Sequence, residues 1–519
     1  MIKRKVLMVA FFPNAVADFL LAPYALKAYV SQFDEICEDY DIEIVNYNIK
    51  KNIDKALKKV KSEHYDLLAF SCYAWNIDHV IALSKAADDM IPIIFGGPEI
   101  SENNLDIFKG INNEKYAIVG EGEKSFKDLL MYYAGRKSDF KFSIEKGNLH
   151  IIGLTDEDEM LDLGTLPSVY QETFPNELIR FREVLVETQR GCLYRCAYCN
   201  GNKGFKKIRY FPLERVYYDL EKIIENDPSE IRFIDSMFAS DKDRAMQILN
   251  FLLVHRSSSN PLIYIEGDVF TIDEPLIDLI CRYKEYPHIN NCNVMLPKDS
   301  PQYFTDMLQH YNLITVIGIQ SLNKESMQSI RRRYLSSERF CEFMKYSNSR
   351  NILLKLDVIL GLPFESMETY FEGLDTIVGQ LQNADHFVAI YVLKVIPNTR
   401  LMEEYKKFEL EFNAHTHNVI ATNAMDSEQF YYAKCITAIL FRLINSPLRN
   451  VFIEKCKELG IGYTEFAKKF YEDMKKQDMI PEKMKDKEFD DYYWHYLIFG
   501  DYKHDFMLQY IQNVHNKGI

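Results

Sequence analysis

The chain has 519 residues, which is long enough for about three domains that each have a core. Hydrophobic residues make up 47% and charged residues 27%, as in ordinary globular proteins, and no stretch reaches the ~18 uninterrupted apolar residues of a membrane span. Acidic residues exceed basic ones by 76 to 62, and the formal charge of −14 argues against a nucleic-acid partner or an anionic membrane surface.

The first 130 residues alternate short apolar runs with amphipathic segments of helix length. The basic, apolar N-terminus could be read as a signal peptide, but "PNAVAD" interrupts it, so a buried first strand is expected. Strands separated by helices predict a parallel, doubly wound (Rossmann-like) α/β domain over residues 1–135, with ligands bound beyond the carboxyl ends of its strands. Strands are expected at residues 6–11, 42–47, 66–73, 91–98 and 116–123, and helices at 21–33 and 75–90.

Residues 136–180 have weak periodicity and are expected to form a linker with a small strand or two. A second strand–helix alternation then predicts a (β/α)6 partial or full parallel barrel over residues 181–400, and the helical pattern of residues 401–519 predicts a mostly helical C-terminal domain. The barrel strands are expected at residues 183–191, 230–238, 262–270, 313–321, 353–365 and 387–397.

Three of the ten cysteines, Cys192, Cys196 and Cys199, directly follow the first predicted barrel strand. Iron–sulfur clusters are normally held by four thiolates, so three would leave one iron free to be chelated by an amino and a carboxylate group. A zinc site completed by a distant histidine (the nearest are His150 and His255) and three unrelated packing cysteines are the alternatives. Without a secretory signal, clustered thiols indicate a metal site in a reducing compartment, so we expect a cytoplasmic protein.

The Cys-x3-Cys-x2-Cys motif, with "RG" before it and an aromatic residue within it, resembles the signature of radical S-adenosylmethionine (SAM) enzymes. The resemblance implies a [4Fe-4S] cluster whose open iron binds SAM and a 5′-deoxyadenosyl radical made from it. "FIDSMF", "GIQSLNKESMQSIRR", "DVILGLPFE" and "YVLKVIPNTRL" resemble the later post-strand segments of these enzymes. We also expect Glu266, on the third strand end, to contact SAM or substrate. With Glu266, the expected SAM contacts are Tyr198, Asp235, Ser236, Gln320, Ser321, Arg331 and Gly361.

"LAFSCYAWNIDHV", "IIFGGPEIS" and "AIVGEGEKSF" resemble the cobalamin-binding domain that precedes many radical SAM domains. The Asp-x-His-x-x-Gly motif that supplies a cobalt ligand elsewhere is missing, so the resemblance implies cobalamin without a protein histidine and with Trp75 over its lower face. Ordinary tight turns and ordinary core packing of Trp75 are the alternatives. The implied cobalamin contacts are Pro13, Ser71, Tyr73, Trp75, Asn76, Gly96, Gly97, Pro98, Glu99, Gly120, Glu121, Gly122 and Glu123.

Together the two modules resemble class B radical SAM methyltransferases. That resemblance implies methylation of an unactivated carbon in a peptide or natural product, by methylcobalamin and a 5′-deoxyadenosyl radical, with electrons from a flavodoxin- or ferredoxin-type donor. A cyclisation, ring contraction or other rearrangement without net methyl transfer is the alternative, and a non-catalytic cobalamin or SAM sensor is a third. Methylthiotransferases are excluded because only Cys37 and Cys72 precede the motif. The segment 285–304 and the aromatic segment 488–502 are candidates to contact substrate.

Overall fold

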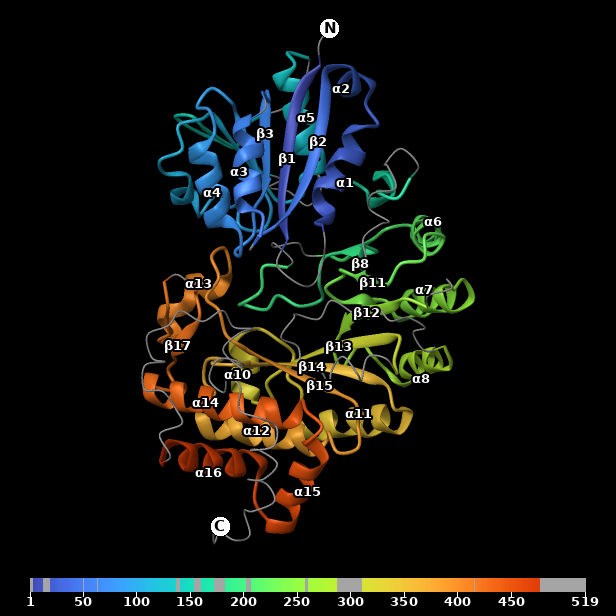
Figure 1. Ribbon diagram of the computed structural model, residues 1–519, viewed down its shortest axis with the longest axis vertical. Helices are drawn as coiled ribbons and strands as arrows, with labels where there is room; N and C mark the ends of the chain where they lie inside the picture. Colours follow the sequence, from blue (N-terminus) through green and yellow to red (C-terminus); the bar gives the residue numbers. More distant parts are fainter. Residues whose placement is uncertain are drawn as a thin grey trace.

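The computed structural model describes residues 3–12, 19–49, 51–62, 64–136, 141–153, 160–171, 183–201, 207–256, 260–286, 310–414 and 416–476. Figure 1 shows two β-sheet modules stacked along the long axis, the N-terminal one in blue and the second in green and yellow. The helices of residues 427–476, in orange and red, pack at the end of the second module that faces away from the first. Predicted site residue Pro13, segment 488–502 and most of segment 285–304 lie outside the described residues.

The N-terminal sheet is parallel except for its last strand, and both of its faces are buried. Alternate residues of its first strand enter different cores, Val6 and Met8 on one face and Leu7 and Val9 on the other, which explains the unbroken apolar run in the sequence. The strand order is β2-β1-β3-β4-β5-β7-β6. The strands are β1 (Arg4–Phe12), β2 (Tyr40–Asn48), β3 (Leu67–Ser71), β4 (Ile93–Gly96), β5 (Lys115–Val119), β6 (Ile144–Lys146) and β7 (Leu149–Gly153), and the helices are α1 (Leu21–Val30), α2 (Asp34–Asp39), α3 (Ile53–Ser62), α4 (Ile77–Ala86) and α5 (Glu123–Tyr133).

The two small strands expected between residues 136 and 180 belong to this sheet. β7 pairs in parallel with β5, and β6 returns antiparallel to β7. The sheet therefore continues to Gly153, beyond the domain boundary placed at residue 135 from the sequence.

The second module is a six-stranded, all-parallel sheet in the order β15-β14-β13-β12-β11-β8. Because β8 and β15 are not paired with each other within the described ranges, the sheet is a partial barrel. Its strands are β8 (Glu183–Val186), β11 (Glu230–Phe233), β12 (Leu262–Gly267), β13 (Leu313–Gln320), β14 (Leu353–Leu360) and β15 (Phe387–Val392). Its helices are α6 (Leu213–Ile224), α7 (Lys242–Val254), α8 (Glu274–Arg282), α10 (Lys324–Ser329), α11 (Ser337–Arg350) and α12 (Met367–Gly379).

All six barrel strands lie within the segments predicted for them. Side-chain caps fix where several helices begin, among them Asp273 before α8 and Ser366 before α12, and such caps contribute about 1 kcal/mol each. A short hairpin, β9 (Gln189–Arg190) with β10 (Arg209–Tyr210), flanks the cysteine segment.

The C-terminal region packs α14 against β15, α12 and α16. α14 begins with a capping box made by Asp426 and Gln429. No single helix of the described chain is long and apolar enough to span a membrane, and α14 and α15 meet that test only as a pair bent by 115°. The elements are α13 (Arg400–Glu404), β16 (Glu411–Phe412), β17 (Val419–Ala421), α14 (Ser427–Ile444), α15 (Arg449–Leu459) and α16 (Tyr463–Lys476), and the 3-10 turns of the chain are η1 (Leu105–Phe108), η3 (Leu163–Thr165), η5 (Phe238–Ser240), η6 (Tyr283–Glu285) and η7 (Tyr405–Phe408).

Candidate functional site

A cavity of about 470 Å³ lies where the carboxyl ends of the N-terminal strands face the cysteine-bearing end of the barrel. Its barrel side includes Gly191 and Gly201, which bracket the three cysteines, together with Ile234 and Ser236 after β11. Its N-terminal side contains nine of the predicted cobalamin residues: Ser71, Tyr73, Gly96, Gly97, Pro98, Gly120, Glu121, Gly122 and Glu123. The ends of both parallel sheets therefore meet at one site, as expected for ligand binding in such folds.

The glycines that line this wall of the cavity differ in what the absence of a side chain permits. Gly97 has a φ of +113°, and a Cβ there would lie 2.5 Å from the backbone oxygen of Cys72. A Cβ on Gly96 or Gly120 would meet nothing within 4 Å. Gly97 is thus required by the close approach of the β3 and β4 loops, whereas Gly96 and Gly120 leave open space beside the cavity.

Trp75 is half-exposed and does not line the cavity; its ring stacks on Tyr73, which does, at a centroid distance of 4.3 Å. Asn76 is fully buried, accepts from the Tyr73 backbone N–H at 2.8 Å and donates to the Ser71 carbonyl at 2.8 Å. These bonds use the side-chain amide of Asn76 to shape the post-β3 turn. The structure therefore presents Tyr73 at the cavity, with Trp75 behind it and Asn76 beneath it.

Glu99 also lies away from the cavity wall. It is buried, and burial, reinforced by the charge of Asp78, raises its pKa to about 7. Its backbone carbonyl accepts from the Asn398 side chain at 2.9 Å, across the two modules. Asn398 has a φ of +64°, a left-handed conformation that Asn tolerates better than most residues.

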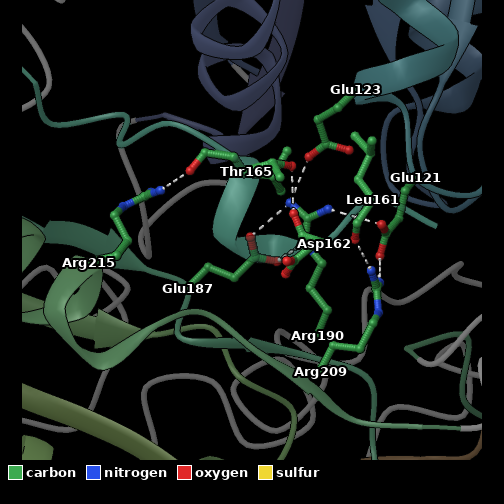
Figure 2. Close-up of polar contacts among 10 residues, drawn as sticks. Glu121, Glu123, Leu161, Asp162, Thr165, Glu187, Arg190, Arg209 and Arg215 are labelled. Carbon is green, nitrogen blue, oxygen red and sulfur yellow. Dashed lines mark hydrogen bonds and ion pairs between the residues drawn. The ribbon is translucent and has the colours of Figure 1, made fainter.

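Charged residues join the two modules beside the cavity. Figure 2 shows Arg190 of β9 directed at carboxylates from both modules, with Nη2 2.7 Å from Glu123, Nη1 3.4 Å from Glu121 and bonds of 3.1 Å to Glu187. Arg209 of β10 also pairs with Glu121. Although burial opposes it, Arg190 keeps the pKa of Glu123 below its ordinary value. Glu121 and Glu123, predicted as ligand contacts, thus line the cavity and also hold the two modules together.

The three cysteines each receive a hydrogen-bond donor. Cys192 Sγ accepts from the Tyr194 backbone N–H at 3.5 Å, and Cys199 Sγ accepts from the Gly201 backbone N–H at 3.2 Å. Cys196 Sγ lies 3.6 Å from the guanidinium of Arg332. Donors of this kind stabilise thiolates and tune a bound cluster.

The described part of the chain contains no group of three His, Cys, Asp or Glu side chains placed to hold a single metal ion. In a four-iron cluster each thiolate binds a different iron, so the three sulfurs do not have to surround a single metal position. Three thiolates on one loop, each with a donor, fit such a cluster. Tyr198 packs beside them on the barrel core, and burial together with Cys196 raises the pKa of its hydroxyl.

Arg332 is the functional candidate that sequence reasoning missed. It donates to the Gly318 carbonyl at 2.7 Å, lies over the Tyr194 ring at 4.9 Å and approaches Cys196. The predicted Arg331 is instead half-exposed, 3.9 Å from Glu404. The three consecutive arginines at 331–333 indicated a basic group near the site, but the sequence does not show which of their side chains faces the cysteines.

Asp235 and Ser236 follow β11 and have different surroundings. Asp235 is buried and accepts from Thr188 N at 2.8 Å, Thr188 Oγ1 at 2.6 Å and Gln189 N at 3.1 Å, and burial raises its pKa to about 7. These bonds commit Asp235 to holding the strand that leads into the cysteine segment. Ser236 is exposed to the cavity and is available to a ligand.

Glu266 projects from β12 into the lumen of the partial barrel. Lys355 of β14 is committed to Asp357 at 2.7 Å and to the Tyr391 hydroxyl at 2.9 Å. Desolvation, reinforced by the charge of Asp357, raises the pKa of Glu266. The lumen therefore presents a mixed set of charged and hydroxyl groups on β14 and β15, which are paired, and on β12, which β13 separates from them.

Two of the remaining residues expected to contact SAM, Ser321 and Gly361, make structural contacts. A third, Gln320, has a strained backbone conformation. Ser321 is buried and donates to Glu365. Gln320, at the end of β13, has a φ of +66°. Gly361 has a φ of +94°, and a Cβ there would meet the Phe430 ring at 2.6 Å, so the absence of a side chain permits the close approach of α14.

A family model described as "B12 binding domain" matches residues 15–130. Two curated relatives are each 23% identical to the chain. The cobalamin-dependent radical SAM methyltransferase TokK of Streptomyces tokunonensis aligns over 85% of this chain and 66% of its own length. The 2-(S-pantetheinyl)-carbapenam-3-carboxylate methyltransferase of Streptantibioticus cattleyicolor aligns over 87% of this chain and 67% of its own. The chain thus spans about two thirds of these relatives.

Two solved structures share the fold. The radical SAM methyltransferase TsrM from Kitasatospora setae, solved with tryptophan substrate and a SAM analogue, has a TM-score of 0.61 at 15% identity and covers 92% of this chain and 100% of its own. The cobalamin-dependent SAM radical enzyme OxsB has a TM-score of 0.60 at 13% identity and covers 99% of this chain and 75% of its own. Another TsrM structure holds cobalamin and a [4Fe-4S] cluster.

These comparisons confirm the predicted fold class and the predicted resemblance to cobalamin-dependent radical SAM enzymes. The three cofactors expected from the sequence are also those with which similar structures were solved.

Proposed function

We propose that the chain is a cobalamin-dependent radical SAM enzyme that methylates an unactivated carbon of a small natural product or peptide. The observation that carries the proposal is the shared cavity: residues within the B12-domain match form one wall, and residues that bracket Cys192–Cys199 form the other. A reaction that needs both cofactors at one substrate requires this juxtaposition.

In this proposal Cys192, Cys196 and Cys199 hold the cluster and the post-strand loops of the N-terminal sheet hold cobalamin. When bound, these groups supply reductive cleavage of SAM and a methyl carrier. Arg332 offsets negative charge at Cys196, and the backbone amides of Tyr194 and Gly201 do the same at the other two sulfurs.

The chain's own residues would also exclude water. The cavity is lined mainly by apolar groups, among them Leu26, Leu185, Ile234 and the Tyr73 ring. A dry site protects a reactive carbon-centred species from side reactions. Because the charged side chains of the wall are paired with one another, they offer few sites for solvent.

The barrel lumen would orient the substrate through Glu266, Asp357 and Tyr391. These groups project from β12, β14 and β15, on the barrel side of the cysteine segment. The relatives support a small-molecule substrate, because one is named for a carbapenam carboxylate and TsrM was solved with tryptophan.

Counting SAM-derived products tests the proposal. The reconstituted full chain, given SAM with a labelled methyl group, cobalamin and a low-potential reductant, should form 5′-deoxyadenosine and S-adenosylhomocysteine. The first without the second would favour the alternative of cyclisation or rearrangement without methyl transfer, and neither product would exclude both activities. The reduced electron carrier is expected to be a flavodoxin or ferredoxin.

A further inference from the structure

The cysteine segment is held at both of its ends by the N-terminal module. Arg190 stands two residues before Cys192 and contacts Glu121, in the loop after β5, and Glu123, the first residue of α5. Asn200 follows Cys199 directly and donates from Nδ2 to the Pro98 carbonyl, after β4, at 2.9 Å. Neither contact is part of the strand pairing of the partial barrel.

The Arg190 end is a desolvated charge cluster. The side chains of Arg190, Glu121 and Glu123 are only 14%, 11% and 6% exposed, so water and salt screen them weakly. Arg190 and Arg209 lie directly opposite each other in the β9–β10 hairpin, and two like charges in that position repel. Glu121 of the N-terminal module pairs with both arginines and so offsets their mutual repulsion.

The Asn200 end is neutral and weaker. It makes one amide-to-carbonyl hydrogen bond, to Pro98 in the loop after β4. The next residue of that loop, Glu99, also contacts the barrel module, because its carbonyl accepts from the Asn398 side chain. Both anchored loops, after β4 and after β5, line the cavity. The segment that carries the cysteines is therefore tied to the loops that face the cavity from the other module.

We propose that Arg190 and Asn200 are positioning residues that fix the distance between the cysteine segment and the cavity loops of the N-terminal module. The inference rests on the proposed function for its purpose, because radical formation and methyl delivery must reach the same substrate. Its physical content, a two-ended anchor, does not depend on any cofactor.

Hydrogen–deuterium exchange of the cofactor-free full chain tests the anchor itself. Arg190→Gln removes the guanidinium shared by Glu121, Glu123 and Glu187, of which Glu121 still pairs with Arg209, and we expect about tenfold or faster exchange in residues 120–126 and 189–201. Asn200→Ala should produce a smaller rise confined to residues 97–101 and 199–201. The matched controls are Arg350→Gln, which breaks an exposed ion pair with Asp278, and Asn226→Ala, which loses an exposed bond to the Lys222 carbonyl. Exchange in the anchored segments that equals the controls would overturn the inference.

A magnetic measurement tests the purpose of the anchor. In the chain reconstituted with iron, sulfide and cob(II)alamin, a reduced cluster speeds electron-spin relaxation of cobalt, and the effect falls steeply with distance. We expect Arg190→Gln to weaken it at unchanged iron and cobalamin content, and Arg190→Lys, which keeps the charge, to restore part of it. Unchanged relaxation in Arg190→Gln would refute the positioning role. If the wild type binds neither group, the proposed function fails while the exchange experiment still judges the anchor.

Discussion

Replacing Gly97 by alanine should destabilise the N-terminal module through a contact inside the protein. The φ of +113° disfavours an L side chain and costs about 1–3 kcal/mol. The new Cβ would lie 2.5 Å from Cys72 O and 2.9 Å from Cys72 N, and overpacking of this kind adds about 1–3 kcal/mol. The expected loss of unfolding free energy is therefore about 2–6 kcal/mol.

Gly120→Ala is the matched control, since Gly120 lines the same cavity with a φ of +88° but its Cβ would meet nothing within 4 Å. It should cost only the backbone strain, about 1–3 kcal/mol, while its methyl group enters the cavity. Urea unfolding of the cofactor-free chain and titration with hydroxocobalamin separate the two effects. Equal destabilisation by the two variants would refute the reasoning about Cys72.

Three further predictions concern the cofactor modules and a buried acid. Alanine at any one cysteine of the motif should abolish the cluster's visible absorbance and SAM cleavage but leave hydroxocobalamin retention intact, and cleavage by a triple variant would contradict the cluster assignment. The three positions are Cys192, Cys196 and Cys199. Trp75→Ala should change the spectrum of bound cobalamin less than Tyr73→Leu does, because Tyr73 lines the cavity and Trp75 stacks behind it; the reverse order would place Trp75 at the ligand. Burial raises the pKa of Glu99 from 4.5 to about 7, so the native state retains a proton that the unfolded chain releases. The stability of the wild type relative to Glu99→Gln should therefore be fully present below pH 4.5 and fall as the pH rises to about 7, and a flat difference in urea midpoints would show that Glu99 is not held protonated.

Strand patterns in this chain were informative because each barrel strand is a short segment rich in apolar residues, even where charged residues such as Lys355 and Asp357 of β14 interrupt it. The six runs predicted all six strands β8 and β11–β15 and placed the cysteines directly beyond the first of them. Strands β6 and β7 were expected, but their membership in the N-terminal sheet was not, since pairing with β5 depends on a contact that no local pattern encodes.

The candidate site was predictable where a residue type is needed for its own chemistry, as in the three cysteines and the glycine loops. It was not predictable where a side chain serves a partner far along the chain. Glu121 and Glu123 form ion pairs with Arg190, almost 70 positions away, and Gly361 lies against the ring of Phe430. Arg331 has a left-handed backbone conformation and an exposed side chain near Glu404, whereas the side chain of Arg332 reaches the Gly318 carbonyl of β13, a difference that the run of arginines does not encode.

Electron paramagnetic resonance of the anaerobically reconstituted full chain tests most directly whether one site unites the two cofactors. The wild type should retain cobalamin, show a reduced cubane signal that shifts when SAM is added, and show magnetic coupling between cluster and cobalt. A chain that retains both groups without any coupling between them, or a cluster signal indifferent to SAM, would contradict the shared site.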